Sequence, residues 1–528
     1  MDSLPLQLLL GVGSVLGVYT IALELSTEQL ESFLLGIGIG LSVFALGSVV
    51  TSQSYTNKTA EKPRSERSIK EAGPPQTPHH VHVLSQLQDM FELSTSQLQR
   101  IVKQMLWDMN RGLEKDNEAI KMLPTHVCHL PKGTEAGSYL ALDLGGTNFR
   151  VCVFTLDGKG GVETRQSKFM IADAVKTSEG AALFDFIADC VKQFFVDHQD
   201  TLSNGVNHKW KLGFCFSFPV NQVSINEGSL LVWTKGFTAS NVVGENAVKL
   251  LQDAFTRKSL NIEVSALVND TTGTLMSLAY SKPSTCAGMI LGTGSNCAYI
   301  EKIENIIKYK GSREGISEML INMEWGGFDD THIVIPRTKY DYKLDSDTPT
   351  PGTWTFEQLI SGLYLGEIVR IVLSDLADQG DLFENCGASP ELKKKNAFET
   401  AYMSKIEIDN SHDLIKVKQI LEVQLGIKHT TLIDRRIVKS VCALVGTRSA
   451  RLAAAGVAAV VTKMNKLATP GCIVGIDGSL FELYPNYQNR MRSALVEMLG
   501  MCADNITLEQ ARDGSGQGAA LIAALAEE

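Results

Sequence analysis

An aspartate near the middle of the chain stands where a general base would be needed. Asp270 comes directly after a short apolar run in the segment Leu267-Val-Asn-Asp-Thr-Thr-Gly273. A carboxylate at the end of a strand can accept a proton from a substrate hydroxyl, and Gly273 allows a neighbouring backbone to come close. Read alone, Asp270 would be a helix N-cap. Its interpretation as a base therefore depends on the other motifs of the chain.

A glycine-rich turn offers a site for phosphate. In the segment Leu142-Asp-Leu-Gly-Gly-Thr-Asn-Phe-Arg150, two glycines and a threonine expose backbone N–H groups that can cradle phosphate oxygens. Arg150 can add a charge-assisted contact. Asp143, at the end of the preceding strand, is placed to orient hydrated Mg²⁺. A Gly-Gly pair alone would indicate an ordinary hairpin turn, but the Asp, Thr and Arg at these spacings favour phosphate.

A second segment places polar side chains among bulky apolar ones. Ser217, in Leu212-Gly-Phe-Cys-Phe-Ser-Phe-Pro219, follows a strand and precedes Phe-Pro, so its hydroxyl is expected at the mouth of a loop. Thr234 and Lys235, in Trp233-Thr-Lys-Gly-Phe237, stand between large apolar residues, which is unusual for a solvated surface. Lys235 could neutralise charge that develops on a transferring phosphoryl group. Alone, it would more often be a surface residue.

Two further carboxylates have the chemistry of a sugar site. Glu324 lies in Asn322-Met-Glu-Trp-Gly-Gly327, and Glu357 lies in Phe356-Glu-Gln-Leu-Ile-Ser-Gly362. Together with Asn269 and Asn296 they supply the acceptors and amides that can grip vicinal sugar hydroxyls. Glu357 read alone would be a residue on a helix surface.

Two strand-turn-strand units are expected to position these motifs. The first consists of strands 139–144 and 149–156 around the Gly-Gly turn, and the second covers 287–300 with its turn at Gly292-Thr-Gly294. In both units an Asn, at 148 and 296, follows close behind the glycines. One unit used twice predicts two related lobes that face a cleft. Helical stretches between the remaining strands predict the α/β class.

Local signals predict several further elements. Ser94-Thr-Ser-Gln97 is typical of a capping box, and apolar residues at helical spacing extend the helix to about Gly112. Residues 473–476 form a short apolar strand that leads into Asp477-Gly-Ser. The glycine-rich stretch 514–518 is expected to be a turn that feeds a final helix.

Composition narrows the class of protein. The chain has 528 residues, and 44% of them are apolar. A chain of this length is too long for one compact core, so we expect at least two lobes with appendages. The net charge of -10, without a long basic stripe, argues against nucleic acid as a partner. Ten cysteines without a C-x-x-C pair indicate reduced, mostly buried thiols in a cytosolic protein.

The N-terminal segment is more apolar than the rest of the chain and carries little charge. Two charge-free runs, 5–23 and 33–55, each approach the length of about 20 residues that a membrane-spanning helix needs. Three glutamates separate the runs and five basic residues follow them, so the positive-inside rule places the remaining chain in the cytosol. We expect a helical hairpin in the membrane, with a single span as the alternative. The Pro- and Ser-rich stretch that follows predicts a tether.

Together these motifs are similar to those of the hexokinase family. The resemblance covers residues 81–526 in the family's order and spacing, and the stretch from Leu212 to Phe237 is highly specific. It implies two unequal α/β lobes of the actin-like type that close on sugar. It also implies transfer of the ATP γ-phosphoryl group to the 6-hydroxyl of glucose and similar hexoses, with Mg²⁺. One copy of the kinase unit is present, as in yeast-type and plant members.

The resemblance further implies roles for individual residues. Asp270 would be the general base, and Lys235 would act with it. The sugar pocket would be lined by Ser217, Phe218, Pro219, Thr234, Lys235, Asn269, Asp270, Asn296, Glu324 and Glu357. ATP would be bound by Asp143, Gly145, Gly146, Thr147, Asn148, Arg150, Thr293, Thr430, Thr431, Gly478 and Ser479, with Mg²⁺ held through water near Asp143 and without a direct protein ligand.

The same resemblance divides the chain into segments. A hydrophobic anchor is similar to that of plant and some fungal members that dock on the mitochondrial outer membrane, which is the membrane we expect here. Departures from the family are a short loop at 172–180 and Gln517 in the last glycine-rich turn. The expected segments are the anchor 1–55, the linker 56–80, the helical start of the large lobe 81–137, the small lobe 138–270, the large lobe 271–513 and the C-terminal helix 514–528, which returns to the small lobe.

Two other functions are weighed against a kinase. A membrane-bound sugar sensor or adaptor with weak or no catalysis would be favoured by loss of Asp270 or Lys235, and both residues are present. An actin-like or chaperone-like ATPase would have no sugar substrate, and Glu324 and Glu357 together with the Ser217 loop argue against it. The sequence therefore favours the hexose kinase.

Overall fold

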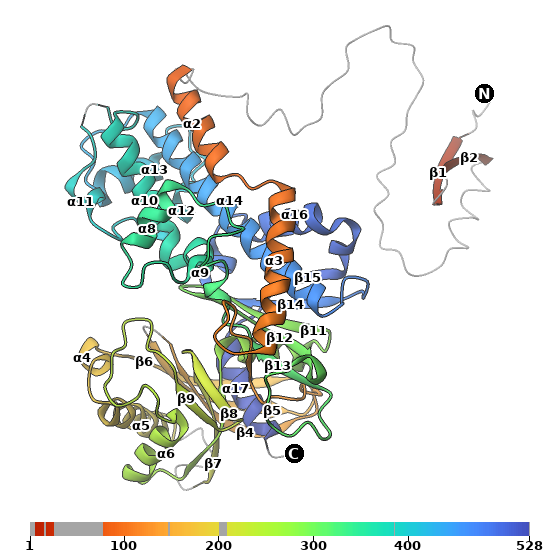
Figure 1. Cartoon of the computed structure of the whole chain (residues 1–528), viewed down its shortest axis with the longest axis vertical. Coiled ribbons are helices and arrows are strands. Elements are labelled where there is room, and N and C mark those ends of the chain that lie inside the picture. The colour runs from red at the N-terminus through yellow and green to blue at the C-terminus, as the bar shows by residue number, and fades with distance from the viewer. Residues whose placement is uncertain are drawn as a thin grey trace, which may run out of the picture. The chain divides into compact units, whose positions relative to one another are not determined.

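The computed structural model describes residues 6–14, 17–25, 78–145, 148–199, 208–384 and 386–526. The chain forms two compact units, Met1–Pro74 and Pro75–Glu528 (Figure 1). All motifs with expected chemistry belong to the second unit. That unit alone therefore positions the candidate site.

The N-terminal unit contains a β-hairpin where the sequence predicts a membrane helix. Strand β1 (Leu6–Ser14) pairs antiparallel with β2 (Gly17–Leu25). The helix predicted over 5–23 is therefore wrong for this stretch. Its Val, Ile, Thr and Tyr residues suit strands, and the cross-strand ladder pairs backbone groups that a helix would have paired internally. The second run, 33–55, and the predicted tether up to residue 77 lie outside the described residues.

The small lobe is built on a five-stranded sheet in the order β10-β7-β4-β5-β6. Strands β4, β7 and β10 are parallel, and β5 and β6 continue from β4 as an antiparallel meander. The predicted Gly-Gly turn joins β4 to β5. A small hairpin, β8 with β9, accompanies the sheet. The strands are β4 (Ala136–Leu144), β5 (Asn148–Asp157), β6 (Val162–Met170), β7 (Trp210–Phe216), β8 (Val220–Ser224), β9 (Glu227–Leu230) and β10 (Ile262–Val268).

The large lobe repeats this arrangement in a six-stranded sheet of order β15-β14-β11-β12-β13-β3. Strands β11, β14 and β15 are parallel, and β12 and β13 form the antiparallel meander. The repeated unit that the sequence predicts is confirmed, and the repeat extends to the whole sheet except β3. The strands are β3 (Leu123–Pro124), β11 (Thr285–Leu291), β12 (Ser295–Lys302), β13 (Glu318–Asn322), β14 (Cys472–Asp477) and β15 (Ile506–Gln510).

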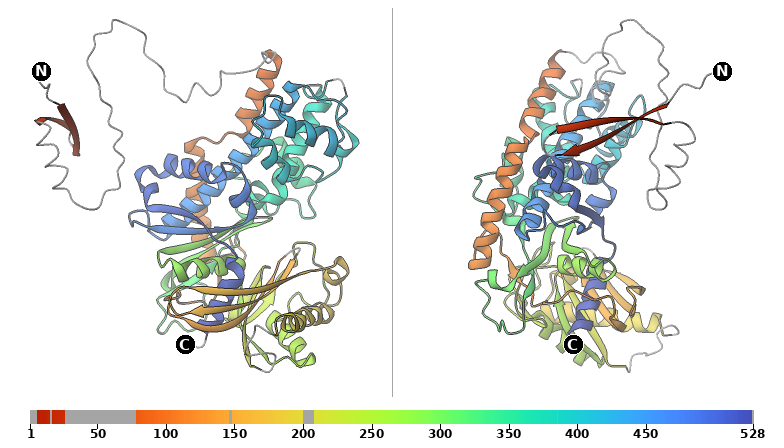
Figure 2. Two further views of the ribbon diagram at one scale, coloured as in Figure 1. Left: turned by 180° about the vertical axis from the view of Figure 1, so that it is seen from behind. Right: turned by 90° about the vertical axis from the view of Figure 1, so that its right-hand side faces the viewer.

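Two crossing helices join the lobes. Helix α7 (Asp270–Ser281) follows a small-lobe strand but packs on β11 and β12, whereas α17 (Gly514–Leu525) follows a large-lobe strand but packs on β4 and β7. Figure 2 shows α17, in dark blue, against the small-lobe strands. The helices cross at glycines, since a Cβ added to Gly518 would lie 2.0 Å from the carbonyl oxygen of Gly273. The sheet of each lobe is thereby covered by the helix that follows a strand of the other lobe's sheet.

The remaining helices complete the cores of the two lobes. Helices α5 and α6 pack on each other in the small-lobe core. In the large lobe, α14 is surrounded by α3, α16, α10, α12 and α2. The helices are α2 (Pro78–Phe91), α3 (Thr95–Glu114), α4 (Asp173–Lys176), α5 (Gly180–Asp197), α6 (Ala247–Arg257), α8 (Lys339–Ser346), α9 (Thr355–Ile360), α10 (Gly362–Gln379), α11 (Pro390–Lys393), α12 (Thr400–Glu407), α13 (Ile415–Gln419), α14 (Leu432–Lys463), α15 (Ser479–Leu483) and α16 (Tyr487–Leu499).

Helix α14 is the one helix among the described residues that is long and apolar enough to cross a membrane. Its most apolar window is 83% buried. Such burial identifies α14 as the central core helix of the large lobe, because a helix that is apolar all round needs protein or lipid on every side.

The first helices show how far local signals reach. The predicted capping box is confirmed, since the Ser94 hydroxyl accepts from the Gln97 N–H at 3.3 Å and the Gln97 side chain accepts from the Ser94 N–H at 2.7 Å. Helix α3 runs to Glu114, two residues beyond the predicted end. Helix α2 already begins at Pro78, within the predicted linker, because proline is well tolerated in the first turn of a helix.

Candidate active site

Asp270 is the first residue of α7, and Asn269 caps that helix. The Asn269 side chain accepts from the Thr271 N–H at 3.0 Å, and one Asp270 oxygen accepts from the same N–H at 2.9 Å. The capping role, which was the alternative for Asp270, is thus filled mainly by Asn269. The Asp270 carboxylate remains partly exposed at a helix N-terminus, where negative charge is favoured.

Three asparagines and a glutamate form one hydrogen-bonded network beside Asp270. The Asn296 amide N–H₂ donates to Asn322 Oδ1 at 2.7 Å, to Glu324 Oε1 at 3.1 Å and, more weakly, to Asn269 Oδ1 at 3.4 Å. The Asn322 amide donates to the same Glu324 oxygen at 2.9 Å. The network thereby connects the start of α7 with the ends of β12 and β13.

Glu324 is held in an uncommon backbone conformation. Its φ of 51° and ψ of 57° are left-handed, which is costly for a residue other than glycine. Its N–H donates to Asn296 Oδ1 at 3.0 Å. Burial raises the pKa of the Glu324 carboxyl, and the charge of Asp270 raises it further, while the Asn322 hydrogen bond, Lys235 and Lys121 lower it. Strain of this kind persists at functional sites, where surrounding contacts fix it.

Glu357 completes an acidic group around the same space. One of its oxygens accepts from the Ser295 N–H at 3.2 Å. Its pKa is raised to about 7, first by burial and then by the charges of Glu324 and Asp270, while the Ser295 N–H and Lys235 oppose the shift. Residues from α7, α9 and the end of β13 therefore converge, and Glu357 is not the helix-surface residue that its own sequence context would indicate.

The small lobe contributes Lys235 to this acidic group. Its ammonium donates to the carbonyl oxygen of Ser217 at 2.7 Å and lies 5.5 Å from the centre of the Phe218 ring. Lys235 has a φ of 56° and precedes Gly236, so the loop turns sharply here. Ser217 and Phe218 are buried. Because the lysine lowers the pKa of both Glu324 and Glu357, its charge acts on carboxylates of the other lobe.

A salt-bridge network joins the end of β4 to the start of β5, on either side of the first glycine-rich segment. The Arg150 guanidinium donates to Asp143 Oδ2 at 3.0 Å and to Asp513 at 2.6 Å, and the Ser515 hydroxyl also donates to Asp143 Oδ2 at 3.0 Å. The end of β4, the start of β5 and the start of α17 are thus joined. Of the predicted phosphate residues, Gly146 and Thr147 lie outside the described residues, as does the side chain of Asn148.

The second turn lies against the end of β14. The carbonyl oxygen of exposed Thr293 accepts from the Leu363 N–H at 3.2 Å. Gly478 has a φ of 131°, and a Cβ there would lie 2.2 Å from the carbonyl oxygen of Leu291. Only glycine lets the chain approach this closely, which brings the 477–479 segment, with Ser479, to the second turn.

Thr430 and Thr431 are engaged elsewhere. Thr430 is fully buried, and its hydroxyl donates to Glu422 at 2.7 Å and accepts from Arg435 at 3.1 Å. Thr431 caps α14 through Asp434. Both side chains thus shape the loop before α14, and their contact with a nucleotide remains a prediction.

Sequence reasoning missed three polar residues of the site. Asn322 stands two positions before Glu324, a spacing that can place side chains on one face of an extended chain. Asp477 directly precedes the predicted Gly478, and its pKa is raised to about 6, mainly by burial, with Asp270 and Asp513 adding to the shift and Arg150 opposing it. Ser515 lay in the last glycine-rich stretch. Each was visible beside a predicted motif.

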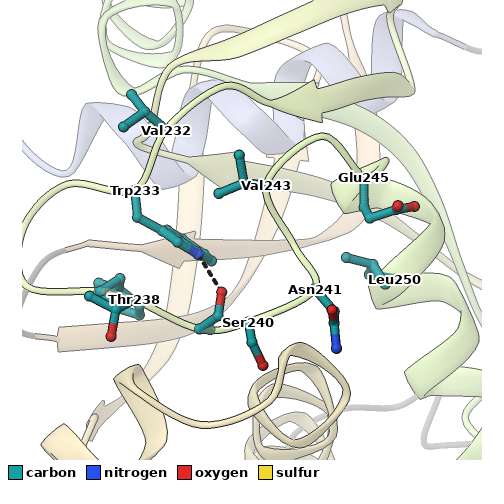
Figure 3. A pocket seen from close by; sticks show the side chains of 10 residues that line it. Val232, Trp233, Thr238, Ser240, Asn241, Val243, Glu245 and Leu250 are labelled. Carbon is teal, nitrogen blue, oxygen red and sulfur yellow. Dashed lines mark hydrogen bonds between the residues drawn. The ribbon is translucent and has the colours of Figure 1, made fainter.

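An open cavity of about 680 Å³ lies in the small lobe along residues 232–250. Figure 3 shows Trp233, Val243 and Leu250 around it, with the hydrogen bond of 2.8 Å from the indole N–H to the Ala239 carbonyl oxygen. Its lining includes none of the predicted site residues, although Thr234 and Lys235 follow Trp233 directly. The candidate site is therefore defined by the converging polar network and not by this cavity.

Two lobes with the same strand order, a glycine-rich turn in each and an acidic site between them define a phosphotransferase of the actin-like fold. Family models described as hexokinase match residues 83–280 and 286–525. The chain belongs to the hexokinase family, whose reaction is the ATP-dependent phosphorylation of a hexose.

Similar proteins support the assignment over most of the chain. Hexokinase-1 of Schizosaccharomyces pombe is 41% identical over 445 residues, which cover 84% of this chain and 90% of that protein. Hexokinase-1 of Saccharomyces cerevisiae is 39% identical, with coverage of 89% and 96%. The structure of the Schistosoma mansoni hexokinase complexed with glucose matches with a TM-score of 0.78 at 36% identity, covering 84% of this chain and 99% of that one.

Proposed function

We propose that this hexokinase transfers the γ-phosphoryl group of ATP to the 6-hydroxyl of glucose and similar hexoses, with Asp270 as the general base. The observation that carries the proposal is the convergence of Asp270, at the junction of the two lobes, with Glu324 and Glu357 of the large lobe and Lys235 of the small lobe. A base with acceptors around it suits a substrate that carries several hydroxyls. The glucose bound in the Schistosoma mansoni structure is consistent with this substrate.

The sugar would lie against the carboxylate and amide network. Glu324 and Glu357 would accept from its hydroxyls, and the loops that hold Ser217 and Lys235 would cover it from the small lobe. The proposed pocket consists of Ser217, Phe218, Pro219, Thr234, Lys235, Asn269, Asp270, Asn296, Glu324 and Glu357.

ATP would bind across the two glycine-rich turns with Mg²⁺. Among the described residues, the hydrogen bonds to Asp143 all reach Oδ2, which leaves Oδ1 for a water of the ion's shell. This carboxylate fits Mg²⁺, which keeps several waters and uses few protein ligands. When bound, the ion would neutralise charge on the phosphate oxygens. The proposed ATP residues are Asp143, Gly145, Gly146, Thr147, Asn148, Arg150, Thr293, Thr430, Thr431, Gly478 and Ser479.

The residues of this chain would then act in three ways. Asp270 orients the 6-hydroxyl and takes its proton. Arg150 and Lys235 stabilise the charge on the moving phosphoryl group. Closure of the small lobe, 138–270, on the large lobe, 271–513, with helix 514–528 moving beside the small lobe, would expel water, so that phosphate reaches sugar and not solvent.

The purified full chain, assayed with ATP and a panel of hexoses, tests this function. We expect ADP release that depends on hexose, and phosphate on carbon 6 by NMR. Hexose binding without transfer would overturn the proposal in favour of a sensor, and ATP hydrolysis without sugar dependence would overturn it in favour of a plain ATPase.

We also propose that residues 1–55 attach the enzyme to a membrane, with the kinase body in the cytosol. Two charge-free runs and the basic residues after them support this. The mitochondrial outer membrane is the expected site. Full-length protein should remain with mitochondria through an alkaline carbonate wash, while protease added to intact organelles removes a C-terminal tag. Release by carbonate, or protection of the tag, would contradict the proposal.

A further inference from the structure

Asn322 is a buried polar residue to which the proposed mechanism gives no task. It ends strand β13 and is 5% exposed. Its amide N–H₂ donates to Glu324 Oε1 at 2.9 Å, and its Oδ1 accepts from the Asn296 amide at 2.7 Å. A neutral amide is the side chain that can donate to one neighbour and accept from the other at the same time.

The hydrogen bonds around Asn322 leave little freedom to its neighbours. The Asn296 Oδ1 accepts from the N–H groups of Cys297 at 2.8 Å and Glu324 at 3.0 Å, and its N–H₂ donates to Asn322 and Glu324. The Asn296 amide therefore has both donors and its acceptor engaged within the protein. Glu324 Oε1 accepts from two amides. Within the described residues these hydrogen bonds reach only Oε1, which leaves the second oxygen, Oε2, as the acceptor that can face a substrate.

We propose that Asn322 is a positioning residue that fixes the Glu324 carboxylate and the Asn296 amide, and thereby sets the affinity for hexose. The inference rests on the proposed sugar site. Without Asn322, the left-handed Glu324 would keep its backbone hydrogen bond. Its carboxylate would lose the shorter of its two amide donors, and the Asn296 amide that supplies the other would lose its own contact with Asn322. An acceptor that must be ordered on binding costs conformational entropy, which weakens affinity.

The neutrality of Asn322 is as important as its geometry. The charged groups around Glu324 are Asp270 at the start of α7, Glu357 on α9, Lys235 from the small lobe and Lys121 before β3. An acid at position 322 would remove the donor to Glu324 and add like charge within hydrogen-bonding distance. Protonation of that acid would restore a donor.

Asn322→Asp makes these effects measurable. We expect the KM for hexose to rise about 10- to 100-fold at neutral pH, since a hydrogen bond to a charged group is lost. The KM for ATP and kcat should remain close to wild type, because the Glu324 contact is expected to hold the hexose equally in the ground state and in the transition state. Toward acid pH the hexose KM of the variant should fall relative to wild type, as the new carboxyl becomes protonated and donates again.

A double-mutant cycle with Glu324→Gln separates positioning from general damage. If Asn322 acts through Glu324, Asn322→Asp should raise the hexose KM much less in the Glu324→Gln background. Thr285→Val is the matched control, because Thr285 is also buried in this sheet and its hydroxyl donates to the Lys282 carbonyl oxygen at 2.8 Å, away from the site. If Asn322→Asp does not fold, Asn322→Ala takes its place in the cycle and tests the loss of the donor, because alanine has no side-chain hydrogen-bonding group.

Additive effects in the cycle, or an unchanged hexose KM in the folded variant, would overturn the positioning role. Failure of the proposed function looks different: the wild type itself would show no hexose-dependent transfer, whatever residue occupies position 322.

Discussion

At the scale of single residues, the candidate site is an acidic group whose members lie in different environments. Asp270 is partly exposed at a helix N-terminus, whereas Glu324 and Glu357 are held by hydrogen bonds to amide and backbone N–H groups. These environments fit the roles proposed above, in which Asp270 exchanges a proton and Glu324 and Glu357 hold the substrate.

The role of Asp270 can be tested by its removal. Asp270→Ala should lower kcat by about 10²- to 10⁴-fold, the usual contribution of a positioned base, while hexose binding by calorimetry largely survives. Asp253→Ala, at an acid paired with Lys249 on the outer helix α6, is the control. Near-normal turnover of Asp270→Ala would remove Asp270 from the mechanism.

Glu324 and Glu357 should act mainly on sugar binding. Glu324→Ala and Glu357→Ala should each weaken hexose affinity by about 1.5–3 kcal/mol, the range for a hydrogen bond to a charged group. Titration calorimetry with glucose measures the effect, and Glu163→Ala, at an exposed acid of β6, should have none. Unchanged affinity in both site variants would show that these carboxylates do not contact the sugar.

The raised pKa of Glu357 also predicts a pH dependence of stability. The folded state holds the proton up to about pH 7, whereas the unfolded chain releases it near its ordinary value of 4.5. The folded state therefore binds more protons between these values, so this stabilising contribution is complete below 4.5 and declines as the pH rises through about 7.

Replacing Glu357 by glutamine should remove this dependence of the folded state's stability on pH. Without hexose, the Tm of Glu357→Gln minus the Tm of wild type should be larger at about pH 8 than at about pH 5. The reason is that wild type loses the stabilising proton over this range, whereas glutamine has no proton to lose. Calorimetric scans at the two pH values measure the difference, with Glu163→Gln as the exposed control. A constant difference in Tm would contradict the raised pKa.

At the scale of elements, the crossing of α7 and α17 connects the site to the fold. Helix α7 begins with Asp270. Helix α17 begins at Gly514, between Asp513 and Ser515, which both belong to the salt-bridge network around Arg150. The two helices touch where Gly273 and Gly518 remove side chains from the contact. The proposed base and the proposed phosphate site therefore both depend on one close contact between two helices.

A methyl group at that contact should disturb both fold and activity. In Gly518→Ala the new Cβ would meet the Gly273 backbone, which cannot move independently of its helix. We expect a loss of about 1–3 kcal/mol in unfolding free energy, as for other overpacked sites. Gln517→Ala, one position earlier in α17, is the control. Equal denaturant midpoints for both variants would show that the crossing is looser than described.

At the scale of the whole molecule, the kinase body is a unit separate from the N-terminal segment. The second compact unit begins at Pro75, and α2 begins at Pro78, where His79 pairs with Asp381 at 2.6 Å. A deletion intended to free the body should therefore end before Pro75, because a cut at residue 80 would remove the first turn of α2.

Removal of residues 1–74 should yield an active enzyme. All residues proposed for sugar and ATP lie beyond this point, so kcat and both KM values should match those of the full chain, and the shortened protein should no longer sediment with membranes. The deletion of residues 1–80 serves as the comparison and should lower the Tm. Inactivity of the 75–528 protein would show that the N-terminal segment takes part in folding or catalysis.

The sequence by itself determined those features that depend on near neighbours. Capping residues, apolar periodicity and glycine-rich turns act within a few positions of the chain, so the α3 cap, the two strand-turn-strand units and the strand before Gly478 follow from them. The family pattern adds the expected site residues, because their order along the chain is characteristic.

Only the tertiary structure decided which distant residues meet. Asn322 and Asp477 enter the site because the ends of β13 and β14 lie near the start of α7, and no local pattern encodes such a contact. Burial near other acids raises the pKa of Glu357. The buried Thr430 donates its hydroxyl to Glu422. Residues 6–25 are apolar enough for a helix, but their pairing partner is another strand. These contacts and pKa values depend on which distant segments pack together and on how deeply each group is buried. Patterns within a few positions of the sequence do not reveal either.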